Sequence, residues 1–177
     1  MIYTTTALKS EAQALVERYK LQKNKLHDYT IYYGENLTVI VSGVGVKNAK
    51  NATEALIKNL PIQNNDIFLN IGICGANKSF KIGEVIKISH IVYNGKIYTI
   101  EQKSLATITC VDQEIKEELY DIVDMESYGF FEATKDIKNR YIYKIVSDHF
   151  KPHKVTKEET KKAVFNALDM IIREIEK

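Results

Sequence analysis

Short apolar runs alternate along the chain with stretches whose apolar residues recur at helical spacing. Runs that are apolar or alternate in polarity, and that are rich in β-branched and aromatic residues, predict strands. They are Met1–Leu8, Leu37–Ser42, Asp66–Ile71, Val85–Val92, Ala106–Val111 and Tyr141–Val146. The run Asp66–Ile71 is almost wholly apolar, which is typical of a strand buried on both faces in a parallel sheet. This alternation of strands and helices favours an α/β fold.

Helices are predicted between and after these strands. Ser10 is expected to begin the first, with Gln13 at the spacing of a capping box. Two more are expected over about Asn48–Leu60 and over Ser127–Lys135. The last helix has the clearest pattern, because Thr156 and Glu159 form a capping box ahead of one apolar face. That face consists of Ala163, Val164, Ala167, Leu168, Ile171, Ile172 and Ile175.

The composition is that of an ordinary globular protein, with 177 residues, 45% of them hydrophobic and 27% charged. We expect one domain over residues 1–177. The net charge of +2 comes from basic residues scattered among acids, so we expect no nucleic-acid partner. Cys74 and Cys110 are isolated, which argues against a disulfide framework or a zinc site. With no membrane span or signal pattern, a cytoplasmic protein without a membrane partner is expected.

Open α/β sheets bind ligands beyond the carboxyl ends of their strands. In this chain those ends carry Glu11, Ser42–Gly45, Gly72–Gly75, Asp124–Glu126 and Ser147–Asp148. These five segments define a candidate pocket that is rich in carboxylates.

Three of these acids have both a chemical and a structural interpretation. Asp148 ends an apolar run, where shielding from water suits a carboxyl group to general acid catalysis, but it could also be a turn or N-cap aspartate. Glu126 could accept the hydroxyls of a ribose while Met125 packs against the sugar. Glu11 could take a proton from water. Each of these two glutamates could instead complement a helix dipole.

Two glycine segments in the candidate pocket would let the backbone approach a ligand closely. They are Gly43-Val44-Gly45 and Gly72-Ile73-Cys74-Gly75, and both are predicted to be turns. Neither matches a phosphate-binding motif. His149 and His153 are four residues apart, but Pro152 disfavours a helix there and no third ligand is near, so no metal site is expected.

Taken in order, these segments resemble the nucleoside phosphorylase/nucleosidase superfamily, and within it the 5′-methylthioadenosine/S-adenosylhomocysteine nucleosidases. The most specific match is Val123-Asp124-Met125-Glu126-Ser127 followed by Val146-Ser147-Asp148. Further matching stretches are Ala7–Glu11, Val41–Ala49, Asn70–Ala76 and Ile82–Ile86. The resemblance implies a three-layer α/β/α sandwich with a central mixed, mostly parallel sheet, and it implies a homodimer.

The resemblance also implies a role for each site residue. Asp148 would protonate the leaving purine, and Ser147 would orient it. Glu11 would activate the attacking water, while Met125 and Glu126 would hold the ribose. The other residues expected to contact substrate are Gly75, Cys74 and Val44. This division of labour is similar to that of the paired carboxylates in glycoside hydrolysis.

Water is expected as the nucleophile. Phosphate usually calls for arginine, and none of the three arginines, at positions 18, 140 and 173, falls in a pocket segment. Phosphorylases often carry an arginine two residues before the second glycine segment, where this chain has Asn70. Lys9 could still supply one positive charge. A phosphate-dependent purine nucleoside phosphorylase therefore stays as an alternative.

Three departures from the family pattern concern specificity. The chain is shorter than typical relatives between about Ile91 and Asp124, Ile73 stands where relatives carry Ser or Thr, and Glu114 falls where an aromatic ring usually meets the base. Two further alternatives follow: a nucleoside-binding module without turnover, and a structural subunit whose acids only cap helices. We expect an N-ribosyl hydrolase of purine salvage, acting on a methylthioadenosine-like or related purine nucleoside, without metal or organic cofactor.

Overall fold

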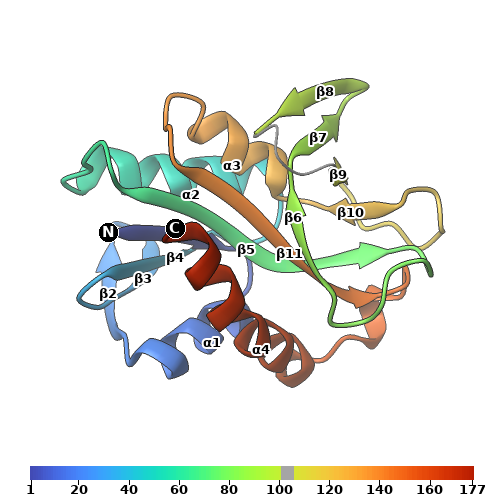
Figure 1. The fold of residues 1–177 in the computed structure, drawn as a ribbon, viewed down its shortest axis with the longest axis horizontal. Helices are drawn as coiled ribbons and strands as arrows, with labels where there is room; N and C mark the ends of the chain where they lie inside the picture. The colour runs from blue at the N-terminus through green and yellow to red at the C-terminus, as the bar shows by residue number, and fades with distance from the viewer. Residues whose placement is uncertain (101–105) are drawn as a thin grey trace.

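The computed structural model describes residues 1–100 and 106–177. It consists of a mixed sheet with helices on both faces (Figure 1), which confirms the predicted three-layer architecture. The strands are β1 (Ile2–Thr6), β2 (Gln22–Leu26), β3 (Tyr29–Tyr33), β4 (Leu37–Val41), β5 (Ile67–Ala76), β6 (Val85–Ile88), β7 (His90–Tyr93), β8 (Lys96–Thr99), β9 (Thr107–Cys110), β10 (Ile122–Asp124) and β11 (Arg140–Asp148). The helices are α1 (Lys9–Tyr19), α2 (Val46–Asn59), α3 (Ser127–Ala133), the short 3₁₀ helix η1 (Pro152–Lys154) and α4 (Lys157–Ile175). In the part of the chain described, no helix is long and apolar enough to cross a membrane.

The centre of the sheet is parallel, and its margins are mixed: β10 is antiparallel to β5, whereas β9 is parallel to both β10 and β7. The order is β2-β3-β4-β1-β5-β10-β9-β7-β8, and β11 lies beside β5 with β6 at its other edge. Strands β4, β1, β5 and β11 are parallel neighbours, whereas β2, β3, β6 and β8 pair antiparallel with theirs. This parallel centre places the carboxyl ends of its strands at one edge, where the candidate pocket was expected.

Each face of the sheet is covered by one pair of helices. Helices α2 and α3 pack together on one face, and α1 and α4 on the other (Figure 1). Successive residues of the central strands alternate between the two cores: Phe68 and Ile142 join the core under α2 and α3, and Leu69 and Tyr143 join the one under α1 and α4. Because both faces are buried, these strands are apolar along most of their length.

Four details differ from the sequence-based expectations. Helix α1 begins at Lys9. The side chain that accepts from the backbone amide before the helix is that of Glu11, not that of Gln13. The run Val85–Val92 is two strands, because the chain changes partner at Ser89: β6 pairs with β11 and β7 pairs with β9. The hairpin of β2 and β3 was not predicted, since β2 is mostly exposed and polar, and neither was β8.

The fourth difference is the segment Gly72–Gly75, which was predicted to be a turn. It is instead the last part of β5, paired with β11 from Gly72 to Gly75. The glycines here are strand residues that neighbouring groups approach closely. The prediction of a turn at Gly43-Val44-Gly45 is correct, because both glycines have positive φ angles of 83° and 106°.

Candidate active site

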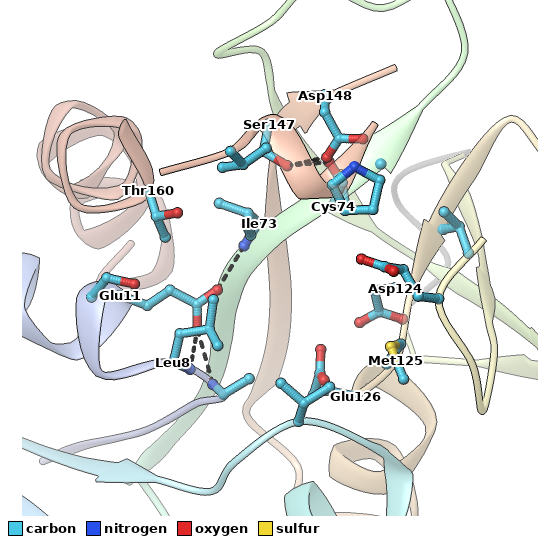
Figure 2. Close-up of a pocket in the computed structure, with 18 of the residues that line it drawn as sticks. Leu8, Glu11, Ile73, Cys74, Asp124, Met125, Glu126, Ser147, Asp148 and Thr160 are labelled. Atoms are coloured by element: carbon cyan, nitrogen blue, oxygen red, sulfur yellow. Dashed lines mark hydrogen bonds between the residues drawn. The ribbon is translucent and has the colours of Figure 1, made fainter. Parts of the chain in front are cut away.

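A cavity of about 520 Å³ lies at the carboxyl edge of the parallel strands (Figure 2). All the site residues predicted from the sequence line it: Asp148, Glu11, Met125, Glu126, Ser147, Gly75, Cys74 and Val44. They come from α1, the loop before α2, the end of β5, the segment between β10 and α3, and the end of β11. The fold therefore brings the five predicted segments to one place.

The cavity forms where the sheet divides at the end of β5. Gly75 pairs with Val123 of β10 on one branch and with Asp148 of β11 on the other. The register of β11 shifts between Val146 and Asp148, so Ser147 is an extra residue on that strand. A bulge of this kind redirects the side chains beside it. The division and the bulge place the carboxyl group of Asp148 at the cavity instead of in the core.

Glu11 holds its carboxylate in the wall of the cavity through three backbone groups. Its Oε2 accepts from the amides of Ala7 at 2.9 Å and Leu8 at 2.8 Å, and its Oε1 accepts from the amide of Ile73 at 2.9 Å. A carboxylate has roughly four acceptor positions, so one stays open, on Oε1. The side chain both caps its own helix and offers an acceptor position to a ligand.

Burial sets the basicity of Glu11. The residue is only 2% exposed, and this burial raises the pKa of its carboxyl group, against the lowering effect of the three amides and of Lys144. A raised pKa makes the carboxylate a better proton acceptor. Gly72 permits this arrangement, because a Cβ at that position would lie 2.7 Å from Oε1 of Glu11.

Glu126 is anchored by the first glycine turn. Its Oε1 accepts from the amide of Gly45 at 2.9 Å, an amide presented by the positive-φ conformation of that glycine. Glu126 is the N-cap residue of α3, but its carboxylate does not cap the helix. Burial raises its pKa to about 7, against the opposing charge of Lys144. The carboxylate therefore faces the cavity without serving its own helix.

Asp148 and Ser147 form a hydrogen-bonded pair. The Ser147 hydroxyl lies 2.7 Å from Oδ2 of Asp148 and 3.1 Å from the carbonyl oxygen of Cys74, and it can donate to only one of them at a time. The other oxygen of Asp148 accepts from the amide of Lys151 at 2.7 Å. Asp148 therefore stabilises a turn, which was the structural interpretation from the sequence, and it also lies at the cavity.

A buried ion pair at the base of the cavity was not predicted from the sequence. Lys144 Nζ lies 2.8 Å from Oδ2 of Asp124, and each side chain is 1% exposed. Asp124 also accepts from the amide and hydroxyl of Ser127, so it is this residue that caps α3. Burial opposes the charge on Lys144, yet Asp124, Glu126 and Glu11 together raise its pKa. One signal was present in the sequence: a lone lysine inside the apolar strand Tyr141–Val146.

The residues that depart from the family pattern also lie at this site. Ile73 and Glu114 line the cavity, as does Lys9. Asn70 does not; it is buried in β5 and donates to the carbonyl oxygen of Thr5. Among the residues that the structure describes, no arginine lines the cavity, and no group of three His, Cys, Asp or Glu side chains is placed to hold a metal ion.

Residues 2–107 match the family model of the phosphorylase superfamily, so the chain belongs to this superfamily. No curated protein matches it. Among solved structures, the 5′-methylthioadenosine/S-adenosylhomocysteine nucleosidase from Neisseria meningitidis, in complex with methylthio-immucillin-A, is 18% identical, with a TM-score of 0.80 over 98% of this chain and 97% of that one. The corresponding nucleosidase from S. pneumoniae is 14% identical, with a TM-score of 0.82 over 98% and 97%. Futalosine hydrolase of Helicobacter pylori is 14% identical, with a TM-score of 0.79 over 98% and 97%. These likenesses show a shared fold.

Proposed function

We propose that this protein hydrolyses the N-glycosidic bond of a purine nucleoside. The observation that carries the proposal is the buried carboxylate of Glu11, which accepts from three backbone amides and lines the same cavity as Asp148 and Glu126. In Figure 2 these three carboxylates come from different walls of the cavity. One ligand between them can meet a proton acceptor, a proton donor and a partner for its hydroxyls.

The roles follow from where charge develops. The bond from C1′ to the base nitrogen breaks, its electron pair stays with the base, and Asp148, oriented by Ser147, delivers a proton to the base. The sugar becomes oxocarbenium-like, and Glu126 holds its hydroxyls while Met125 packs against it. A water molecule forms the new bond to C1′ and gives a proton to Glu11. The products are the free base and the free sugar.

Water is favoured over phosphate by the lining of the cavity. Phosphate is usually bound by arginine, whose planar fork meets two oxygens at once. None of the described residues that line the cavity is an arginine. The solved nucleosidases and futalosine hydrolase that share the fold are named as hydrolases of this kind, which supports the same choice.

A panel of purine nucleosides tests the proposal. Purified protein is incubated with adenosine, inosine, guanosine, 5′-methylthioadenosine and S-adenosylhomocysteine, with and without inorganic phosphate, and base release is followed by chromatography. Release without phosphate from at least one compound is expected. Release only with phosphate would make the protein a phosphorylase. Release from none of these compounds in either buffer, and from none of the corresponding 5′-phosphates or 5′-carboxylates, would rule out the enzyme.

Ile73 favours a second candidate, a module that binds a nucleoside without turning it over. Its side chain brings an aliphatic group to the cavity beside Glu11, where it can form no hydrogen bond to water or sugar. In that case adenosine or inosine would raise the melting temperature of the protein without being cleaved. The single domain, the homodimer, the part in purine salvage and the cytoplasmic location remain predictions.

A further inference from the structure

The cavity has two chemically different sides. Along the sheet and the loops near it, its charged residues are Glu114, Asp124, Glu126 and Asp148, all of them acids. Where the first turns of α1 and α4 meet the cavity, the charged lining residues are Lys9, Glu11 and Lys157, and the carboxylate of Glu11 is bound by the Ile73 amide of β5. Glu11 and the acids of the sheet side include the groups assigned to base, sugar and water. The two lysines have no part in that assignment.

Lys9 and Lys157 occupy equivalent places. Each is the first residue of its helix, α1 of 11 residues and α4 of 19, and each side chain is exposed. Among the described residues, neither lies within 4.0 Å of a carboxylate. Neither ammonium group is therefore neutralised by a carboxylate of the described residues.

The wall around these lysines is polar. Ser10, Thr156 and Thr160 line the cavity there, together with apolar side chains such as Leu8 and Val155. A wall of this composition suits an anion better than it suits an alkyl chain.

The proposed function decides which part of the ligand meets this wall. With the base at Asp148 and the ribose hydroxyls at Glu126, the remaining substituent of the sugar is C5′. In Figure 2, Leu8 and Thr160 lie on the side of the cavity away from Asp124 and Met125. C5′ therefore points toward the first turns of α1 and α4.

We propose that the substrate carries an anionic group, a phosphate or a carboxylate, on its 5′ carbon, held between Lys9 and Lys157. The inference rests on the proposed function and makes it more specific: the substrate is a purine nucleoside 5′-phosphate or 5′-carboxylate, and not a thioether nucleoside with a neutral tail. The lysines bind the anion and take no part in breaking the glycosidic bond.

The experiment compares kcat/KM for adenosine 5′-monophosphate, adenosine-5′-carboxylic acid, adenosine and 5′-methylthioadenosine, and repeats the comparison with hypoxanthine in place of adenine. At least one anionic compound is expected to exceed both neutral ones on the order of tenfold, as charged hydrogen bonds allow. Added salt should reduce this preference. Preference for the phosphate or for the carboxylate identifies the source of the anion. Equal or better cleavage of the neutral compounds overturns the inference and leaves the proposed function standing.

Substitutions connect the preference to the lysines. Lys9→Met and Lys157→Met should each lower the ratio of phosphate to adenosine turnover several-fold, mainly through KM. Lys162→Met is the matched control, because Lys162 is a lysine of α4 that does not line the cavity, and it should leave the ratio unchanged. A preference that survives both cavity substitutions contradicts the inference.

Two other outcomes are also decisive. Cleavage that requires inorganic phosphate and yields a sugar 1-phosphate would assign the lysines to free phosphate and overturn the inference. If no compound is cleaved, the proposed function fails, and calorimetric titration then tests the anion site alone. Tighter binding of adenosine 5′-monophosphate than of adenosine, lost in Lys9→Met and Lys157→Met, would support the site; equal binding of the two would rule it out.

Discussion

The sheet side and the helix side of the cavity are built in different ways. On the sheet side, Glu126 and Asp148 are buried and held by backbone amides, and so is Glu11, which comes from the first turn of α1 but is bound by the Ile73 amide of β5. On the helix side, Lys9 and Lys157 are exposed and project from first turns. A side chain held by the backbone depends on the fold, whereas an exposed one can change at little cost to stability. The comparison teaches that the carboxylates proposed for the chemistry are fixed by the architecture, while the lysines proposed to select the substrate are surface positions.

The largest expected effect is the loss of turnover in Asp148→Asn, which tests whether the sheet side carries the chemistry. An amide keeps the size of the side chain and can still accept from the Lys151 amide, but it cannot deliver the proton. Because general acid catalysis contributes about 10²–10⁴-fold, kcat should fall by that factor. Steady-state base release measures it, and circular dichroism checks the fold.

The control for this substitution is Asp28→Asn, at a position between β2 and β3. It makes the same chemical change away from the cavity and should leave kcat unaltered. Retention of more than about a tenth of the wild-type kcat in Asp148→Asn would contradict the role of Asp148 as the acid.

The second effect is on stability and concerns the ion pair beneath the sheet side. Lys144→Met leaves Asp124 buried without its counter-ion, close to two further glutamates, and should cost about 3–5 kcal/mol. Urea denaturation measures the loss. Adding Asp124→Asn to Lys144→Met should recover part of it, since the uncompensated charge is then removed.

An exposed pair provides the contrast. Lys58 pairs with Glu54 at 3.0 Å on α2, with the lysine side chain 70% exposed. Lys58→Met should cost less than about 1 kcal/mol. Similar costs for the two lysine substitutions would mean that the buried pair has no special importance to the fold.

The sequence predicted the sheet side better than the hydrogen bonds that hold it. Alternating polarity and the position of acids after apolar runs were enough to bring Glu11, Glu126 and Asp148 to one site. The bonds from the Ile73 amide to Glu11 and from the Gly45 amide to Glu126 join residues far apart in the chain, so no local pattern contains them. Lys144 was missed for the same reason: its partner Asp124 lies on a strand that is not its neighbour in the sheet.

The glycine segment Gly72–Gly75 shows a second limit of sequence patterns. Glycines after an apolar run are typical of a turn, and a turn was predicted. In the structure the strand continues, and Gly72 is required because the Glu11 carboxylate occupies the place of its missing Cβ. Such a requirement comes from tertiary packing and is not visible in the segment itself.

The third effect follows from this contact and tests how tightly the sheet side is assembled. In Gly72→Ala the new Cβ would lie 2.7 Å from Oε1 of Glu11, so the carboxylate must move. Overpacking should cost about 1–3 kcal/mol of stability. A displacement of about 1 Å should lower kcat by up to about 10²-fold. Denaturation and steady-state kinetics measure the two losses.

A double-mutant cycle identifies the contact responsible. In a Glu11→Ala background the methyl group introduced by Gly72→Ala has room, so this substitution should cost clearly less stability than it does in the wild type. Equal costs in the two backgrounds would show that the clash is with another group.

The smallest expected effect is a pH dependence of stability caused by Glu126, and it tests whether burial on the sheet side carries an electrostatic cost. Its carboxyl pKa is about 7 in the folded protein, above its ordinary value of 4.5. Between these values the unfolded chain has lost the proton and the folded protein keeps it, so the free energy of unfolding falls as pH rises. Glu11 has a raised pKa and contributes in the same direction.

Glu126→Gln retains an acceptor for the Gly45 amide but cannot ionise. Between about pH 5 and 8, the free energy of unfolding of this variant should therefore decline by about 1–3 kcal/mol less than that of the wild type. Urea titrations across this range measure both slopes, and parallel slopes would mean that Glu126 does not carry the cost. A smaller decline in Glu126→Gln would mean that the wild type gives up stability near neutral pH to keep a buried carboxylate at the cavity.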